Sequence, residues 1–222
     1  MGAEIGKARF APSTLHLGGE KIGQLGLGLL TGEGVIQIAA DGGARQARYY
    51  GRAIHTLIGD MDSLSETEIA ELAAGSEIFR YPEEKNETDL ELALIRAADK
   101  GATWIRIIAA IGDRLDQTLS NVYLLALPAL RGRDVRLVAG KQEAWLLYPG
   151  ETVIAGAAGD TLSLLPISGE ARGIRTENLY YPLRDETLTF GPARGISNVL
   201  NADIARVWLA DGVLLAVHTI GR

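Results

Sequence analysis

The sequence predicts an α/β amino-terminal domain with a mainly parallel sheet, followed by an all-β sandwich domain. Two observations lead to this prediction. Between about residues 15 and 139, short apolar runs alternate with helical patterns, which is typical of a parallel sheet flanked by helices. Beyond about residue 141 the helical periodicity ends, and short apolar runs follow one another between Gly, Pro and Asp clusters. We expect the domains to span residues 1–142 and 143–222.

In the first part, two helix starts are marked by capping-box spacings, Ser65 with Glu68 and Thr88 with Glu91. The second of these helices is expected to end at Gly101, because glycine commonly follows the last helical turn. The strand candidates, in chain order, are VIQIAA, TLI, EIFRY, TWIRIIAAI and DVRLVAG.

In the second part, all the regular elements are expected to be strands. Asp211 and Gly212 lie between two apolar runs and predict a tight hairpin, because both residues tolerate the positive φ of a primed turn. The strand candidates are ETVIA, TLSLLPI, TLTFG, IARVWLA and VLLAVHTI.

Composition excludes several classes of function. A net charge of -6 provides no broad positive surface for a nucleic acid. The chain has no cysteine, so disulfides, thiolate zinc sites and cysteine nucleophiles are excluded, and a cytoplasmic location is expected. The first residues lack the apolar core of a signal peptide, and polar residues interrupt the apolar stretch 22–40, so we expect no targeting or transmembrane segment.

The segment IGDMDS places Asp60 and Asp62 directly after a short apolar run. In an open α/β sheet, ligands bind outside the carboxyl ends of the strands, which is where these two aspartates are expected. Two carboxylates this close repel one another unless a cation lies beside them, and a hard divalent ion suits their oxygens. The alternative is a polar turn in which one aspartate caps the helix that begins near Ser65.

Two further segments bring carboxylates to helix starts. KNETDLELAL places Asp89 in a first helical turn, where it either meets a ligand or simply stabilises the helix. GDRLDQTLSN offers Arg114 for phosphate oxygens and Asp116 for a metal or a hydroxyl, or else forms a solvated turn and a cap. Because three successive strand ends deliver carboxylates to one sheet edge, a shared site is favoured.

The segment AADGGAR repeats the pattern, with glycines that let backbone amides approach a phosphate or a nucleotide ring. It contains Asp41, Gly42 and Gly43, and Gly18-Gly19 is a weaker candidate of the same kind. The chain has neither the Rossmann nor the Walker glycine pattern. The residues alone therefore predict a magnesium-dependent enzyme that acts on a phosphorylated ligand.

In their order, ADGGA, IGDMDS, KNETDLELAL, GDRLDQTLSN, GDTLSLLPISG, NLYYPL and GISN resemble the thiamin pyrophosphokinase family, from about residue 39 to residue 218. The resemblance implies transfer of the pyrophosphoryl group of ATP to the hydroxyl of thiamin, giving thiamin diphosphate and AMP. It also implies an ATP-binding α/β domain, a β-sandwich that helps bind thiamin, and a homodimer whose active sites are shared between subunits.

By motif position, the resemblance also assigns roles to residues. Asp60, Asp62 and Asp89 would bind Mg²⁺, and Ser197 and Asn198 in GISN would contact the aminopyrimidine of thiamin. The expected catalytic residues are Asp62, Asp89, Arg114 and Asp116. The expected ATP-binding residues are Asp41, Gly42, Gly43, Asp60, Arg114 and Asn121.

The chain departs from the family pattern at two positions. Asn86 stands where the family usually has Asp, and Gln117 stands where it commonly has His, so neither position is expected to do acid–base work here. Two other functions are alternatives. One is a pyrophosphokinase for another hydroxyalkyl heterocycle such as a pterin, which the segments NLYYPL and GISN disfavour. The other is a non-catalytic thiamin diphosphate binding protein, which the intact carboxylates disfavour.

Overall fold

The computed structural model describes residues 7–11 and 35–221. The glycine pair Gly18-Gly19, a candidate phosphate contact, lies outside these residues. The chain divides into two compact units, Met1–Gly140 and Lys141–Arg222, and each unit is described here by itself.

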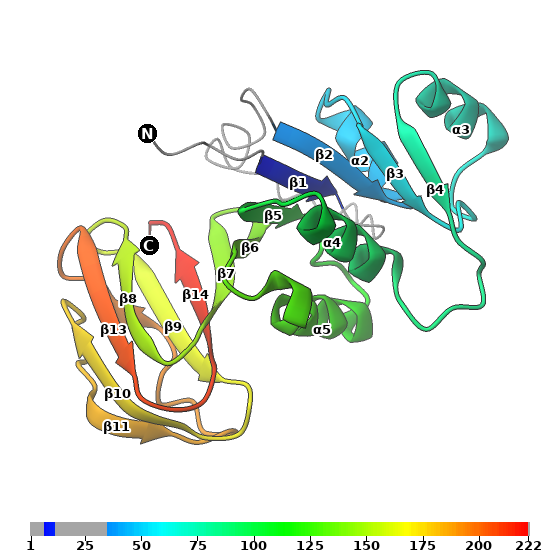
Figure 1. Ribbon diagram of the computed structural model, residues 1–222. Helices are drawn as coiled ribbons and strands as arrows, with labels where there is room; N and C mark the ends of the chain where they lie inside the picture. The colour runs from blue at the N-terminus through cyan, green and yellow to red at the C-terminus, as the bar shows by residue number, and fades with distance from the viewer. Residues whose placement is uncertain (1–6, 12–34, 222) are drawn as a thin grey trace. The chain divides into compact units, whose positions relative to one another are not determined.

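The first unit contains six parallel strands in the order β6-β5-β1-β2-β3-β4 (Figure 1). Parallel pairing brings the carboxyl ends of all six strands to the same edge of the sheet. The strands are β1 (Lys7–Ala11), β2 (Val35–Ala40), β3 (Thr56–Gly59), β4 (Glu77–Arg80), β5 (Trp104–Ile108) and β6 (Asp134–Ala139).

Among the described residues, four α-helices connect these strands, and each follows a strand, because neighbouring parallel strands need a crossover connection. Their apolar faces pack on the sheet, where Leu57, Leu94 and Ile105 are completely buried. The helices are α2 (Gly43–Tyr49), α3 (Glu66–Ala73), α4 (Asp89–Asp99) and α5 (Leu115–Tyr123), and two short 3-10 turns follow α5, η1 (Leu124–Ala126) and η2 (Pro128–Leu130).

The predicted helix signals act at the expected positions. Ser65 and Glu68 form a complete capping box at the start of α3, with each side chain bonded to the other's backbone amide. At α4 only one half forms, since Thr88 accepts from the amide of Glu91. Gly101 follows the end of α4 with a φ of 78°, the left-handed conformation that glycine adopts without strain.

The second unit contains antiparallel strands in the orders β12-β9-β14-β7 and β11-β10-β13-β8. Buried side chains from both groups, among them Leu164, Leu214, Ile174 and Val207, belong to one hydrophobic core. The strands are β7 (Gln142–Leu147), β8 (Gly150–Ala155), β9 (Thr161–Pro166), β10 (Ala171–Glu177), β11 (Arg184–Leu188), β12 (Asn198–Val199), β13 (Ile204–Leu209) and β14 (Leu214–Thr219).

The predicted outline, helices with parallel strands first and antiparallel strands after, is confirmed. The predicted hairpin at Asp211 and Gly212 is wrong, because β13 and β14 are not paired and belong to different strand groups. Gly212 does adopt a positive φ of 94°, and a β-carbon there would lie 2.5 Å from the carbonyl oxygen of Glu170, so both the conformation and the close approach require glycine. Among the described helices, none is long and apolar enough to cross a membrane.

Candidate functional site

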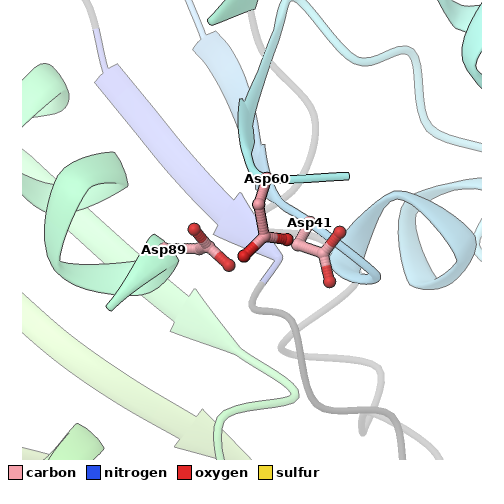
Figure 2. Close-up of side chains that lie close together, drawn as sticks. All are labelled: Asp41, Asp60 and Asp89. Carbon is pink, nitrogen blue, oxygen red and sulfur yellow. The ribbon is translucent and has the colours of Figure 1, made fainter. Parts of the chain in front are cut away.

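Three carboxylates meet at the carboxyl-terminal edge of the parallel sheet. Asp41 follows β2, Asp60 follows β3, and Asp89 is the first residue of α4, which follows β4. One oxygen from each of these side chains lies within 4.8 Å of the others, and Figure 2 shows the three side chains close together. The sequence brings them together because each comes directly after, or starts the helix after, a strand of the same parallel sheet.

Gly59 makes room for this cluster. A β-carbon at position 59 would lie 3.0 Å from Cβ of Asp41 and 3.1 Å from Cγ of Asp89, closer than most β-carbons approach their neighbours. Its φ of 148° is also one that other residues rarely adopt. Two neighbouring residues, Asp41 and Met61, have positive φ values of 42° and 67°. Non-glycine residues in this region store strain, which is typical of functional sites.

The electrostatics of the cluster follow from its burial. Asp41 is 5% exposed, and its Oδ1 atom is buried without a hydrogen-bond partner among the described residues. Burial raises the pKa of Asp89 above its ordinary value, against the opposing effect of Lys85. Burial acts in the same direction on Asp60, but the amide of Asp62 and the ammonium of Lys85 outweigh it and lower the pKa of Asp60. A buried cluster of three carboxylates therefore favours a cation beside it.

Lys85 already supplies one positive charge. Its Nζ lies 3.2 Å from Oδ2 of Asp60 and 3.0 Å from Oδ1 of Asp89, and it also donates to the carbonyl oxygen of Pro82 at 3.3 Å. The contact with Asp89 is an ion pair only, because Oδ1 of Asp89 has no hydrogen-bond partner among the described residues. Although burial lowers it, these carboxylates hold the pKa of Lys85 above its ordinary value. One lysine therefore balances one of three carboxylates.

The donor set fits a magnesium ion. Its ligand atoms are all carboxylate oxygens, which are the donors that hard divalent cations prefer. The buried, unpaired Oδ1 of Asp41 is costly unless a cation or a donor meets it. These two observations support a divalent cation at Asp41, Asp60 and Asp89.

Asp62, a predicted metal ligand, is not one of the three grouped carboxylates. Its amide donates to Oδ1 of Asp60 at 3.2 Å, and its side chain is more exposed than those of the cluster. The negative charge of Asp60, followed by burial, raises the pKa of Asp62. Its role as a ligand therefore stays a prediction. Asp41 was predicted to bind ATP and not a metal, although its position directly after a strand is the signal that places it beside Asp60.

Arg114 and Asp116 contact one another at the start of α5. Nη2 of Arg114 lies 2.6 Å from Oδ2 of Asp116, and the two side chains are 61% and 68% exposed. The hydrogen bond from Arg114 lowers the pKa of Asp116. By contrast Asn121 is buried, and its amide donates to the carbonyl oxygen of Ala110 at 2.8 Å, which fixes the turn between β5 and α5.

The predicted glycines of the first loop begin helix α2. Gly42 is its N-cap and Gly43 its first residue, and both are buried. Their predicted contact with ATP stays a prediction.

In the second unit, Asn198 uses its side-chain amide within the protein. Its Oδ1 accepts from the amides of Tyr181 and Val199, both at 2.9 Å, and its Nδ2 donates to the carbonyl oxygen of Tyr181 at 2.7 Å. These bonds hold the exposed Tyr180 and Tyr181, whose rings lie edge to face with centroids 4.7 Å apart. Ser197, with a φ of 57°, is exposed.

Comparison with known proteins identifies the family. Residues 29–137 match the model of the thiamin pyrophosphokinase catalytic domain, and residues 151–214 match that of the thiamin pyrophosphokinase vitamin B1 binding domain. Together the two matches cover well over half of the chain. The chain belongs to the thiamin pyrophosphokinase family. The clustered aspartates, Lys85, Arg114 and Asp116 fall in the first match, and Ser197 and Asn198 fall in the second.

Individual thiamin pyrophosphokinases agree with this assignment. The chain is 29% identical to the thiamine pyrophosphokinase of Bacillus subtilis over 163 residues, which cover 72% of this chain and 76% of that protein. The crystal structure of a Bacillus subtilis thiamine pyrophosphokinase has a TM-score of 0.84 at 24% identity, covering 97% of this chain and all of the other. The yeast enzyme has a TM-score of 0.79 at 16% identity, covering 99% and 88%. At these identities the structures establish the fold.

Proposed function

We propose that this thiamin pyrophosphokinase transfers the pyrophosphoryl group of ATP to the hydroxyl of thiamin at the carboxylate edge of its parallel sheet. The proposal rests above all on the cluster of Asp41, Asp60 and Asp89, with an unpaired buried oxygen on Asp41. Pyrophosphoryl transfer depends mainly on positioning and charge neutralisation, which a carboxylate-bound cation serves.

In this proposal Asp41, Asp60 and Asp89 hold Mg²⁺, and Asp62 lies beside them as a further candidate ligand. When bound, the ion supplies positive charge to the phosphate oxygens. The exposed guanidinium of Arg114 is proposed to pair with phosphate oxygens beside its contact with Asp116. Gly42, Gly43 and Asn121 belong to the same end of the sheet and are proposed to line the ATP site.

Asp116 is proposed to orient the hydroxyl of thiamin, not to act as a strong base. Its pKa is lowered by Arg114, so it stays ionised and is a weak acceptor of a proton. A loose transition state makes little demand on a base, because the leaving group departs before the attacking oxygen has bonded fully. The ionised carboxylate is then suited to accept a hydrogen bond from the hydroxyl and hold it in line.

Thiamin recognition is proposed for the segment around Ser197 and Asn198. The exposed Ser197 is available for a polar contact, whereas Asn198 has both acceptor positions of its oxygen and one N–H engaged with the protein. We therefore propose that Asn198 acts on thiamin chiefly by holding Tyr180 and Tyr181 in place. Exposed aromatic faces suit a cationic heterocycle, because their π-electrons attract positive charge.

We also propose a homodimer whose active sites are shared between subunits, and a cytoplasmic location. The absence of cysteine fits a reducing compartment.

The function itself is tested by incubating the purified protein with ATP, Mg²⁺ and thiamin. Thiamin diphosphate and AMP are expected to form in equal amounts. Formation of ADP and thiamin monophosphate, or no product with thiamin, contradicts the proposal; turnover of a hydroxymethyl pterin supports the alternative substrate.

A further inference from the structure

Lys85 occupies carboxylate oxygens that a metal ion would use. Its side chain is 11% exposed, and its ammonium group bridges Oδ2 of Asp60 and Oδ1 of Asp89, at 3.2 and 3.0 Å. A third contact is the hydrogen bond to the carbonyl oxygen of Pro82. Two hydrogen bonds and one ion pair therefore hold the ammonium group at this place.

The position of Lys85 in the chain keeps it there. It lies four residues before Asp89, in the segment that leads from β4 to the N-cap Thr88 of helix α4. By contrast, the nearby Arg45 is held by Glu68, with two hydrogen bonds of 2.7 and 2.9 Å. Asp41 contributes an unpaired buried oxygen to the cluster, whereas Asp60 and Asp89 each contribute an oxygen that contacts Lys85.

We propose that Lys85 is a built-in counter-cation of the site, which competes with the divalent metal for Asp60 and Asp89 and thereby keeps metal binding weak in the protein alone. This inference rests on the proposed metal site. It gives Lys85 a role in the charge balance of the site, because the metal must overcome the positive charge of Lys85 to enter. The additional negative charge that favours metal entry then comes from the triphosphate, so the metal is expected to bind chiefly as the nucleotide complex.

The size of the effect follows from Coulomb's law. A single positive charge a few ångströms from a divalent ion weakens its binding by about tenfold even at the dielectric constant of water, and by more where water is excluded. A competing ammonium and a merely structural lysine have opposite consequences. Loss of a competitor tightens metal binding, whereas loss of a structural support loosens the carboxylates and weakens it.

The test measures Mn²⁺ binding to the full chain without ATP or thiamin. The electron paramagnetic resonance signal of free Mn²⁺ reports how much of the ion stays unbound. Lys85→Met removes the charge and keeps most of the side-chain volume, and Lys85→Arg keeps the charge. The matched control is Lys100→Met, which removes another partly exposed lysine of the same unit that pairs with Glu77 at 3.1 Å. We expect Lys85→Met to bind Mn²⁺ at least about tenfold more tightly than wild type, and Lys85→Arg and Lys100→Met to resemble wild type.

Thermal unfolding provides the second measurement. Without added metal, Lys85→Met is expected to melt at a lower temperature than wild type, because three carboxylates then lie together without a counter-charge. Saturating Mn²⁺ is expected to raise its melting temperature more than that of wild type, because tighter binding stabilises the folded state more.

The outcomes separate this inference from the proposed function. Unchanged or weaker Mn²⁺ binding by a folded Lys85→Met protein overturns the competition, while an intact yield of thiamin diphosphate in wild type leaves the proposed function standing. If no variant binds Mn²⁺, with or without ATP, both the metal site and this inference are overturned.

Discussion

Gly59 and Asp89 lie so close that a β-carbon at position 59 would be 3.1 Å from Cγ of Asp89. The carboxylate cluster therefore depends on a residue that carries no functional group. Gly59→Ala is expected to push Asp89 and Asp41 apart, to lower stability by about 1–3 kcal/mol, and to reduce turnover at least about tenfold. The measurements are thermal unfolding and thiamin diphosphate formation.

Gly75→Ala is the matched control for this change, because a β-carbon at Gly75 meets nothing within 4 Å. It should keep wild-type activity and stability within about 0.5 kcal/mol. If Gly59→Ala retains full activity, the close approach of the three carboxylates is not needed for the reaction.

Asp41→Asn tests which carboxylates hold the metal. It removes a charge from the buried side chain with the unpaired oxygen, and we expect kcat to fall by about a hundredfold or more with the fold intact. For both variants, kcat is measured as a function of Mg²⁺ concentration, and Asp62→Asn tests the more exposed neighbour. If kcat falls strongly in Asp62→Asn but changes little in Asp41→Asn, then Asp62 and not Asp41 is a metal ligand.

Asn198→Ala is expected to reduce both stability and thiamin binding. It leaves the amide and the carbonyl oxygen of Tyr181 without their partner, which costs about 1–3 kcal/mol where such groups are buried. The KM for thiamin should rise more than the KM for ATP, because the Tyr180–Tyr181 segment is then misplaced. Asn201→Ala, at an exposed position in the same unit, is the control. Equal changes in both KM values would assign Asn198 a purely structural role.

A buried pair in the second unit predicts how stability depends on pH. Nε2 of His218 lies 2.8 Å from Oδ2 of Asp160, and both side chains are buried. Burial raises the pKa of Asp160, but the amides of Gly221 and Ala157 and the ring of His218 outweigh it, so the pKa is lowered. The stabilisation is therefore present above about pH 4 and is lost as the pH falls toward the pKa of the folded protein.

Asp160→Asn should accordingly lower the melting temperature at pH 7, and the difference from wild type should shrink as the pH falls below about 4. Asp203→Asn changes an exposed aspartate of the same unit and serves as the comparison. A difference that is the same at pH 3 and pH 7 would show that the charge of Asp160 contributes nothing to stability.

Subunit mixing tests the proposed sharing of active sites. Inactive Asp89→Asn subunits and impaired Asn198→Ala subunits are dissociated, mixed and reassembled. In a heterodimer with shared sites, one site carries both changes and the other neither, so random pairing restores about a quarter of all sites. If mass spectrometry finds heterodimers but activity does not rise above that of the parents, each site is built within one subunit.

The elements with strong local signals were predictable. The run VIQIAA became β2, and the Ser65 capping box formed in full, because each depends on residues that are neighbours in sequence. Strand β10 was missed because it has only two buried apolar residues, Ala171 and Ile174, and an irregular register that disrupts alternation. Strand β1 was missed because it is short, and two of its five residues, Lys7 and Arg9, are charged.

The site was predictable only in part. That aspartates gather at one sheet edge follows from parallel topology, which the sequence pattern indicates. The identity of the clustered set does not, because it depends on side-chain directions: Asp60 is turned toward Asp41 and Asp89, whereas Asp62, two residues later, is not in the group. The contacts of Lys85 and of the Asn198 amide depend on how the folded chain packs, and no periodic sequence pattern predicts them.

The pairing of β7 with β14 has a consequence for synthesis of the chain. These are the first and last strands of the second unit, and they pair along six residues from Gln142↔Thr219 to Leu147↔Leu214. The pairing of these strands cannot be completed until residues 214–219 have left the ribosome, whereas Asp41, Asp60, Lys85 and Asp89 are all synthesised before β7. During translation the apolar residues of β7 therefore lack this partner until β14 has emerged, and apolar strands exposed in this way are prone to aggregation.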